Sequence, residues 1–144
     1  MAKEQRKNLG RLHNVLVFYQ LFAEGGPMKN NSKHLLDRWI LERLNQLIFE
    51  SVEGFRAYEL DRASRVIASF IDDLSVWYIR RSRDRLKGSD KKDKQAALAT
   101  LRHTLYQLSL ILAPSMPFYA EHLYQAVKRE DDPVSVHLLS LIHI

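Results

Sequence analysis

Residues 77–85, with the sequence WYIRRSRDR, place two aromatic side chains directly before four arginines. Guanidinium groups bind phosphate oxygens through paired hydrogen bonds, and aromatic rings stack against bases that are not paired with other bases. This combination of residue types is typical of a site that binds nucleic acid. The segment supplies six candidate contacts, namely Trp77, Tyr78, Arg80, Arg81, Arg83 and Arg85.

The basic residues of the chain are concentrated in the same region. Between Arg80 and Lys94 there are eight basic residues and three acidic ones, and this excess of five equals the net charge of the whole chain. The rest of the chain is therefore neutral, and the excess forms a local patch that attracts anions. Lys91 and Lys92 are candidates for further phosphate contacts, although a lysine run is also typical of a solvated loop.

Each candidate also has a purely structural interpretation. Trp77 and Tyr78 continue the apolar stripe of a predicted helix, so they would also suit the protein core. The arginines would also suit a solvated helix face on which they pair with Asp84. The pattern alone leaves both interpretations open.

The sequence lacks the patterns that several catalytic and metal sites require. It has no cysteine, which excludes disulfides, thiolate catalysis and cysteine-bound zinc within the chain. Its six histidines show neither the H-E-x-x-H spacing of zinc proteases nor the Glu-x-x-His spacing of di-iron bundles. Glycine-rich nucleotide loops and the G-x-S-x-G nucleophile turn are missing as well. We therefore expect no metal and no other cofactor.

Asp72 and Asp73 form an adjacent acidic pair on a predicted helix. Neighbouring residues on a helix point about 100° apart, so these carboxylates do not form a catalytic dyad. We expect them to form a solvated or salt-bridged edge.

The length and composition indicate one globular domain. A chain of 144 residues with 46% hydrophobic and 27% charged residues is ordinary for a soluble domain. No apolar run approaches the roughly 18 residues of a membrane span, and the first ten residues are not followed by the apolar region of a signal peptide. We expect a cytoplasmic location.

Residues 58–87 are predicted to form one long helix, because no proline or glycine interrupts them. Apolar residues recur along this segment at steps of three and four, and the same stripe continues into Arg81 and Arg85. We therefore expect a helix that is buried for most of its length and presents a cationic end to the solvent. The apolar members of the stripe are Leu60, Ala63, Ile67, Phe70, Ile71, Leu74, Trp77 and Tyr78.

Other amphipathic segments predict four further helices. Ser32 is placed to cap the second of these helices, Gly54 to end it, and Pro117 suits the first turn of the last. The Gly-Gly-Pro sequence at residues 25–27 would end the first helix. The predicted ranges are 3–23, 32–53, 92–113 and 117–128.

Long amphipathic helices with short connections predict an all-α fold, an antiparallel bundle of about five helices. Residues 1–140 would form this one domain, and residues 141–144 a tail. Residues 134–144 alternate only weakly in polarity and are too few for a sheet, so we expect them to be extended.

Several segments also resemble a known family. Residues 57–85, which contain AYELDRASRVIASFIDDLSVWYIRRSR, closely resemble the helical anticodon-binding domain of class I aminoacyl-tRNA synthetases, specifically of the isoleucyl enzymes. LDRWILERLN at residues 36–45 is similar to the start of that family's second helix, and LAPSMPF at residues 112–118 is similar to its proline turn before the last helix. LHNVLVFYQLFA resembles its first helix, so that the resemblance covers roughly residues 8–140.

The aromatic pair running into R-R-S-R is similar to the isoleucyl type found in eukaryotes, archaea and some bacteria. Valyl and leucyl relatives share the bundle and the proline turn but not this run. The chain departs from the family at Asp84, Leu86 and Lys87, where another basic residue and bulky aromatic residues are usual, and at residues 141–144.

The resemblance implies a module that binds the anticodon stem-loop of isoleucine tRNA, within an enzyme that uses ATP to charge tRNA with isoleucine. The H-I-G-H and K-M-S-K-S signatures of the catalytic fold are missing from this sequence, so by itself the chain is expected to catalyse nothing and to bind no ATP. Its expected partners are tRNA and the remainder of the synthetase, and we expect a monomer. The residues assigned to the RNA are the six candidates in residues 77–85 together with Arg38, Lys91 and Lys92.

Two alternatives from outside the isoleucyl enzymes are kept. The chain would also suit the anticodon-binding domain of a valyl- or leucyl-type synthetase, or a basic helical module that binds another protein. A peripheral membrane helix is disfavoured, because the basic patch follows the apolar turns along the helix and does not lie on the opposite face.

Overall fold

The computed structural model describes residues 2–23 and 32–139, and these fold into helices and connecting turns without a strand. The predicted all-α bundle is confirmed. Because α3, η1 and α4 follow one another without a break, the described residues form five helical rods, as predicted, and one short 3₁₀ turn. The elements are α1 (Ala2–Phe22), α2 (Leu35–Arg56), α3 (Leu60–Asp72), the π-helix η1 (Asp73–Ile79), α4 (Arg80–Lys87), α5 (Lys91–Leu112), α6 (Pro117–Val127) and the 3₁₀-helix η2 (Val136–Leu138).

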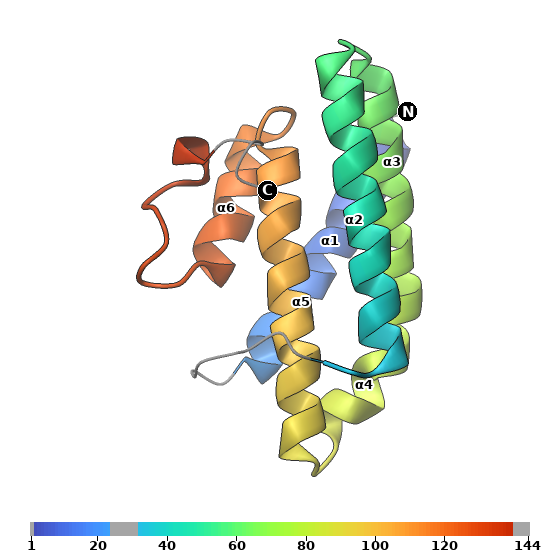
Figure 1. Cartoon of the computed structure of the whole chain (residues 1–144), viewed down its shortest axis with the longest axis vertical. Coiled ribbons are helices and arrows are strands. Elements are labelled where there is room, and N and C mark those ends of the chain that lie inside the picture. Colours follow the sequence, from blue (N-terminus) through green and yellow to red (C-terminus); the bar gives the residue numbers. More distant parts are fainter. Residues whose placement is uncertain (1, 24–31, 140–144) are drawn as a thin grey trace.

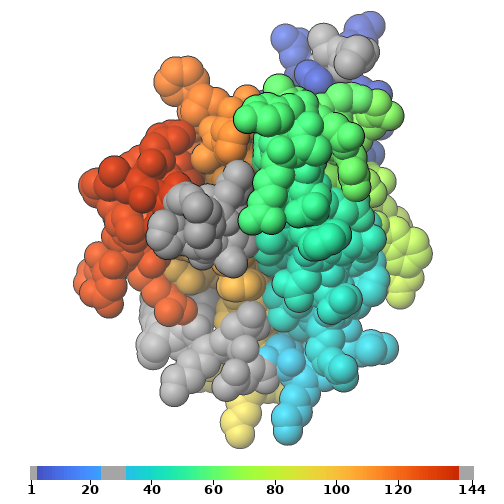
Figure 2. All heavy atoms as spheres, turned by 45° about the horizontal axis from the view of Figure 1, so that its top comes forward, coloured from blue at the N-terminus to red at the C-terminus, as the bar shows by residue number. Residues whose placement is uncertain are grey.

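The helices form a bundle with two distinct ends (Figure 1). Helices α2 and α3 form an antiparallel pair, α5 packs against α2, and α6 packs against α5 on the side away from that pair. Helix α1 runs behind α2 and α5 and contacts α3, η1, α5 and α6. The α2–α3 turn and the α5–α6 turn lie at one end, which Figure 2 brings forward, and α4 lies at the other.

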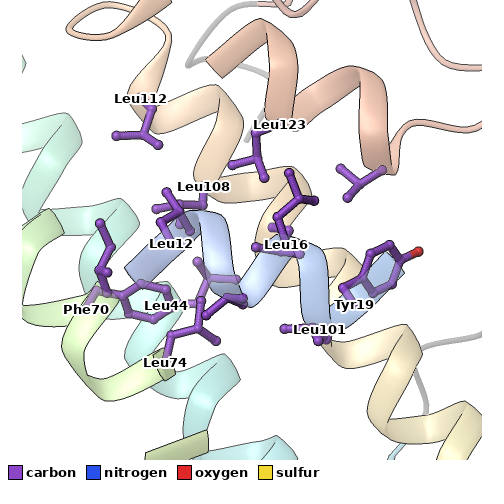
Figure 3. Close-up of a cluster of buried hydrophobic side chains, with 14 of the residues drawn as sticks. Leu12, Leu16, Tyr19, Leu44, Phe70, Leu74, Leu101, Leu108, Leu112 and Leu123 are labelled. Carbon is purple, nitrogen blue, oxygen red and sulfur yellow. The ribbon is translucent and has the colours of Figure 1, made fainter. Parts of the chain in front are cut away.

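Apolar side chains from α1, α2, α3, η1, α5 and α6 meet along the axis of the bundle (Figure 3), and Leu86 of α4 belongs to the same cluster. Full burial of one such side chain stabilises the fold by about 1.5–3 kcal/mol, so this cluster is the main source of stability. Its central members, each no more than 2% exposed, include Leu12, Leu16, Leu44, Phe70, Leu74, Leu101, Leu108, Leu112 and Leu123.

The turn between α2 and α3 differs from the prediction. Helix α2 does not end at Gly54 but continues to Arg56, and Gly54 is buried at a close contact with Ala63 of α3. The backbone N–H of Glu59 donates to the carbonyl of Gly54, and that of Tyr58 to Phe55, which satisfies the last carbonyls of α2. Tyr58 has a φ of 58° in this turn, so α3 begins only at Leu60.

The structure also differs from the prediction at the start of α2 and in the C-terminal segment. His34, and not Ser32, is the N-cap of α2, since its ring nitrogen Nδ1 accepts a hydrogen bond from the backbone N–H of Leu36. The stretch predicted to be extended forms η2 at Val136–Leu138, and Val136 is fully buried. The predicted stop at residues 25–27 and the tail at residues 141–144 lie outside the described residues.

The predicted long helix is present, but seven of its residues form the π-helix η1. Hydrogen bonds between residues five apart give a π-helix more residues per turn than an α-helix. In an α-helix, Trp77 and Tyr78 would share the buried face with Leu74. In the π-helix, Tyr78 and Ile79 share that face instead. The buried stripe accordingly continues through Tyr78, Ile79, Ser82 and Leu86, and leaves Trp77 and Arg81 outside.

Candidate nucleic-acid interface

Trp77, Arg80, Arg81 and Arg83 are exposed on the outer side of η1 and α4. Half of the Trp77 side chain is accessible to solvent. The guanidinium carbon of Arg81 lies 4.7 Å from the centre of the indole ring, which is a cation–π contact. Arg80 and Arg83 are exposed as well, and no ion pair involves them within the described part of the chain. The predicted pairing of these arginines with Asp84 is not formed.

Tyr78 lies in the interior, which corrects its assignment as an RNA contact. Its side chain is 1% exposed, and its hydroxyl donates a hydrogen bond of 2.8 Å to Oδ1 of Asp37. Burial and the negative charge of Asp37 both raise the pKa of Tyr78 well above the usual range. Because the ring is enclosed by protein, no base can stack on it, and the interpretation of Tyr78 as a core residue is the correct one.

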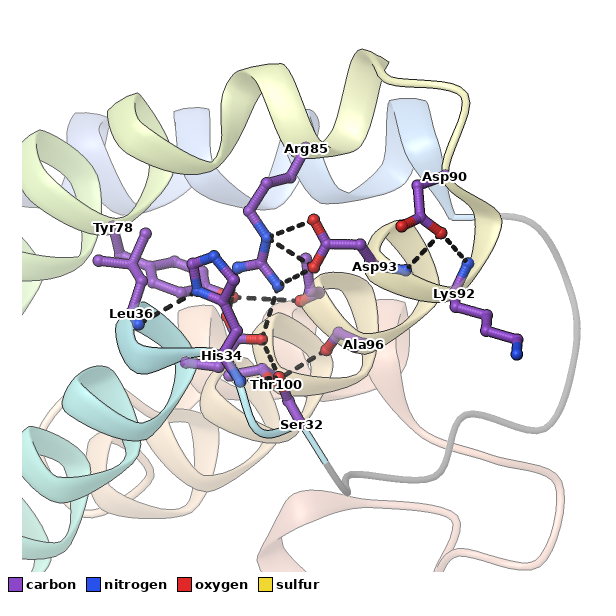
Figure 4. A network of polar contacts seen from close by, with 12 residues as sticks. Ser32, His34, Leu36, Tyr78, Arg85, Asp90, Lys92, Asp93, Ala96 and Thr100 are labelled. Atoms are coloured by element: carbon purple, nitrogen blue, oxygen red, sulfur yellow. Dashed lines mark hydrogen bonds and ion pairs between the residues drawn. The ribbon is translucent and has the colours of Figure 1, made fainter.

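Arg85 also points inward, which corrects its assignment to phosphate (Figure 4). Its side chain is 9% exposed and lies between two carboxylates from other helices. Nη1 and Nη2 donate to the carboxylate of Asp37 at 2.7 and 2.9 Å, and Nε and Nη2 donate to Asp93 at 3.0 and 2.7 Å. Arg85 lies seven residues after Tyr78, about two α-helical turns, and this spacing keeps it on the inner side of α4.

The charges of this cluster compensate one another inside the protein. Burial alone would raise the pKa of Asp37, but hydrogen bonds from Arg85, Ser32 and Tyr78 outweigh it and hold that pKa below its usual value. Hydrogen bonds from Arg85 likewise lower the pKa of Asp93. Burial alone would lower the pKa of Arg85, and the two carboxylates raise it instead. All three side chains are therefore ionised at neutral pH.

The loss of Arg85 from the interface leaves the basic patch intact. Arg85 and Asp93 neutralise each other, and without them residues 80–94 still hold seven basic and two acidic residues, the same excess of five. Asp90 caps α5 by accepting hydrogen bonds from the backbone N–H groups of Lys92 and Asp93. Lys91 and Lys92 therefore begin a helix and do not belong to a loop, and Lys92 points away from the buried cluster (Figure 4). Arg38, near the start of α2, is exposed too.

Asp37 is the residue that the sequence interpretation missed. It is fully buried and connects α2 to η1 and α4. A signal was present, because Asp37 lies three residues before Ile40 and seven before Leu44, on the apolar stripe of its own helix. A carboxylate in such a position requires a buried partner. Nothing in the sequence says that this partner is 48 residues away.

The predicted acidic edge is confirmed. Asp72 pairs with Arg11 of α1, and Asp73 accepts hydrogen bonds from Arg43 of α2 at 2.8 Å. Asp72 therefore connects the end of α3 to α1, and Asp73 connects the start of η1 to α2. Within residues 2–23 and 32–139, no group of three or more acidic or histidine side chains could hold a metal ion. No described helix is long and apolar enough to cross a membrane.

A helical bundle with a cationic, aromatic end is suited to binding an RNA arm, and comparison with known proteins gives the class. Residues 37–142 match the family described as the anticodon-binding domain of tRNA ligase. The chain belongs to this family, as the resemblance implied.

Curated relatives of the chain include isoleucine–tRNA ligases. It is 42% identical over 139 residues to the enzyme of Chlamydia muridarum, 39% over 146 residues to that of Thermobifida fusca and 38% over 144 residues to that of Clostridium kluyveri. These alignments cover 92–94% of the chain but only 13–14% of the relatives. The chain therefore spans about one seventh of the length of the curated relatives it matches.

Proposed function

We propose that this chain is the tRNA-binding module of an isoleucyl-type synthetase and that it holds the anticodon stem-loop at the end of the bundle formed by α4. The observation that carries the proposal is the set of exposed arginines on α4, which have no carboxylate partners in the described structure although carboxylates pair with Arg85 on the same helix. A phosphate backbone supplies the missing anions. Arg80, Arg81 and Arg83 are the central contacts, with Arg38, Lys91 and Lys92 at the rim.

The proposal also concerns the activity of the enzyme of which this module is a part. That enzyme charges isoleucine tRNA with isoleucine in the cytoplasm and consumes ATP in a catalytic part that this sequence does not carry. The module itself supplies binding and orientation of the tRNA and no chemical step. Its other partner is the remainder of the synthetase, and by itself it is a monomer.

The test is the affinity of the 144-residue chain for a fluorescent anticodon stem-loop of isoleucine tRNA, measured by anisotropy at several salt concentrations. The combined Arg80→Ala, Arg81→Ala and Arg83→Ala variant is expected to bind more weakly. Each lost phosphate contact lowers the slope of log affinity against log salt by about 0.7 in a single-stranded region, so the slope should fall by about 2.

A control with the same change in charge is available at the far end of the bundle. Arg56, Arg62 and Arg65 each pair with a carboxylate on their own helix turn or the adjacent one. Their combined replacement by alanine should leave the affinity within about twofold, because paired surface arginines offer little to an RNA bound elsewhere. Equal losses in the two variants would show that only net charge matters, and the proposed interface would then be wrong.

A duplex RNA of the same charge separates this function from that of a basic module for proteins. An anticodon-binding module should bind the stem-loop in preference to the duplex, because bases are accessible only in the loop. Salt-dependent binding of both RNAs with equal affinity would contradict the proposal and favour the alternative, a basic helical module that binds another protein.

A further inference from the structure

Trp77 is exposed because of the π-helix η1. In an uninterrupted α-helix, a residue three positions after the buried Leu74 would face the core, as the sequence predicts. In the structure Tyr78 and Ile79 take that place at 1% and 5% exposure, and Trp77 is left 50% exposed. The π-helix thus keeps Tyr78 buried, brings Ile79 into the core in place of Trp77, and leaves the indole ring at the surface.

Exposure of the indole ring forgoes the stabilisation that its burial would give, and a binding role for the ring would account for this. An indole ring is a large apolar surface whose burial would stabilise the fold. π-Helices are rare and occur frequently at functional sites. Val76, the neighbour of Trp77, is 40% exposed, so the helix presents an apolar surface to the solvent at this point and not only one ring.

The surroundings of Trp77 indicate an anionic ligand with a flat aromatic part. Arg80 and Arg81 lie three and four residues after Trp77, on the same side of the helix. Arg81 already lies over the indole ring at 4.7 Å. Asp84, one turn further, is the acidic residue on this side of α4 and has no ion pair within the described residues. The side therefore combines one accessible ring with a net positive charge.

We propose that the accessible surface of Trp77 is a stacking platform for one unpaired base of the bound RNA loop, and that Arg81 holds the ring from its other side and pairs with the phosphate of the stacked nucleotide. This inference rests on the proposed function and assigns a position to one base. A base inside a duplex is already stacked on its neighbours, so the platform selects loops over stems.

Fluorescence can test this contact directly, because the chain has only two tryptophans. Trp39 packs half-buried against the core, and Trp39→Phe keeps an aromatic ring there while leaving Trp77 as the single emitter. Titration with the anticodon stem-loop should quench the emission of Trp77, and the quenching should saturate at the same RNA concentration as the anisotropy of the labelled RNA. The stem alone, without its loop, should cause no quenching.

A double-mutant cycle identifies the base. Trp77→Ala in the otherwise unchanged chain should weaken binding by about 5- to 150-fold, the usual effect of removing one stacking contact, and Trp77→Phe should restore most of the affinity. One abasic nucleotide in the loop should cause a similar loss in the unchanged chain and no further loss in Trp77→Ala. Circular dichroism checks that each variant is folded.

The outcomes separate the two proposals. Binding of the stem-loop with unchanged Trp77 emission, or additive effects of Trp77→Ala and of every abasic position, would overturn the platform and leave the proposed function standing. Absence of binding by the unchanged chain would overturn both.

Discussion

At the scale of single residues, Arg81 and Arg85 lie four positions apart but have opposite surroundings. Arg81 covers an exposed indole ring, whereas Arg85 lies between two carboxylates and is 9% exposed. A cation that is removed from water requires such partners, because the cost of desolvation is large. The role of each arginine is therefore set by the acidic residues that other helices bring to it, and the sequence around the two arginines does not distinguish them.

Arg85→Ala is expected to destabilise the fold without acting through RNA contacts. The substitution leaves the carboxylate of Asp37 buried with only two neutral donors, Tyr78 and Ser32, and breaking a buried ion pair in this way costs about 3–5 kcal/mol. Urea unfolding followed by circular dichroism measures this loss. Arg83→Ala, an exposed neighbour, should change the free energy of unfolding by less than about 0.5 kcal/mol. Similar values for the two variants would show that the buried cluster does not stabilise the fold.

The same cluster should make the protein sensitive to acid. The pKa values of Asp37 and Asp93 are lower in the folded protein than in the unfolded chain, so both carboxylates stabilise the fold above about pH 4, and this stabilisation is lost as the pH falls through the lowered folded-state values. Urea midpoints measured between pH 7 and pH 2.5 should fall on the acid side. In Asp37→Asn the decrease should be smaller, because one of the two carboxylates is gone. An equal decrease would assign the acid sensitivity to other groups.

At the scale of the elements, the sequence predicted most of what the structure shows. All five helical rods were predicted with boundaries within a few residues, because each buries a stripe whose period is visible in the sequence. The π-helix η1 was not predicted, since a shift in backbone hydrogen bonding leaves no mark on composition. That one shift is why the predicted apolar stripe included Trp77, which is exposed in the structure. The ion pairs of Arg85 were missed for another reason, because they depend on contacts between residues far apart in the chain.

Two glycines in helices should respond to alanine in opposite directions. A Cβ added to Gly54 would lie 3.1 Å from the Cβ of Ala63, and also close to the Ala63 backbone, where α2 and α3 approach each other. Gly54→Ala should therefore separate these helices and destabilise the fold by about 1–3 kcal/mol. Gly10 in α1 is exposed and has nothing within 4 Å of such an atom, so Gly10→Ala should stabilise the fold by about 0.5–1 kcal/mol.

The two glycine variants are compared by thermal and urea unfolding. The Gly10 variant is the control for helix propensity, because it has the same gain in propensity without the close contact. If Gly54→Ala were as stabilising as Gly10→Ala, the contact between α2 and α3 would be loose and the prediction would be wrong.

At the scale of the whole molecule, the two ends of the bundle differ in character. The end formed by α4 carries the exposed arginines. The opposite end, at the α2–α3 and α5–α6 turns, exposes apolar side chains, with Tyr58 at 91%, Leu60 at 63% and Phe118 at 92%. The end formed by α4 combines exposed arginines with the accessible ring of Trp77, and the proposed RNA contacts all lie there or at its rim.

Burial of tyrosines throughout the bundle gives a prediction for alkaline solution. Burial is the main cause that raises the pKa of five of the six tyrosines, to about 12 for Tyr119 and Tyr124, and these five come from α1, η1, α5 and α6. A group whose pKa is higher in the folded state stabilises the fold below its unfolded-state pKa, here about 10, and this contribution is lost as the pH rises towards the folded-state value. The urea midpoint should therefore fall between pH 9 and pH 11.5. Absorbance at 295 nm should show three of the phenols, those of Tyr78, Tyr119 and Tyr124, ionising well above pH 10 in the folded protein and near pH 10 in urea. Ionisation of all six near pH 10 without unfolding would mean that these rings are open to water, and the packing of α6 on α5 would then be wrong.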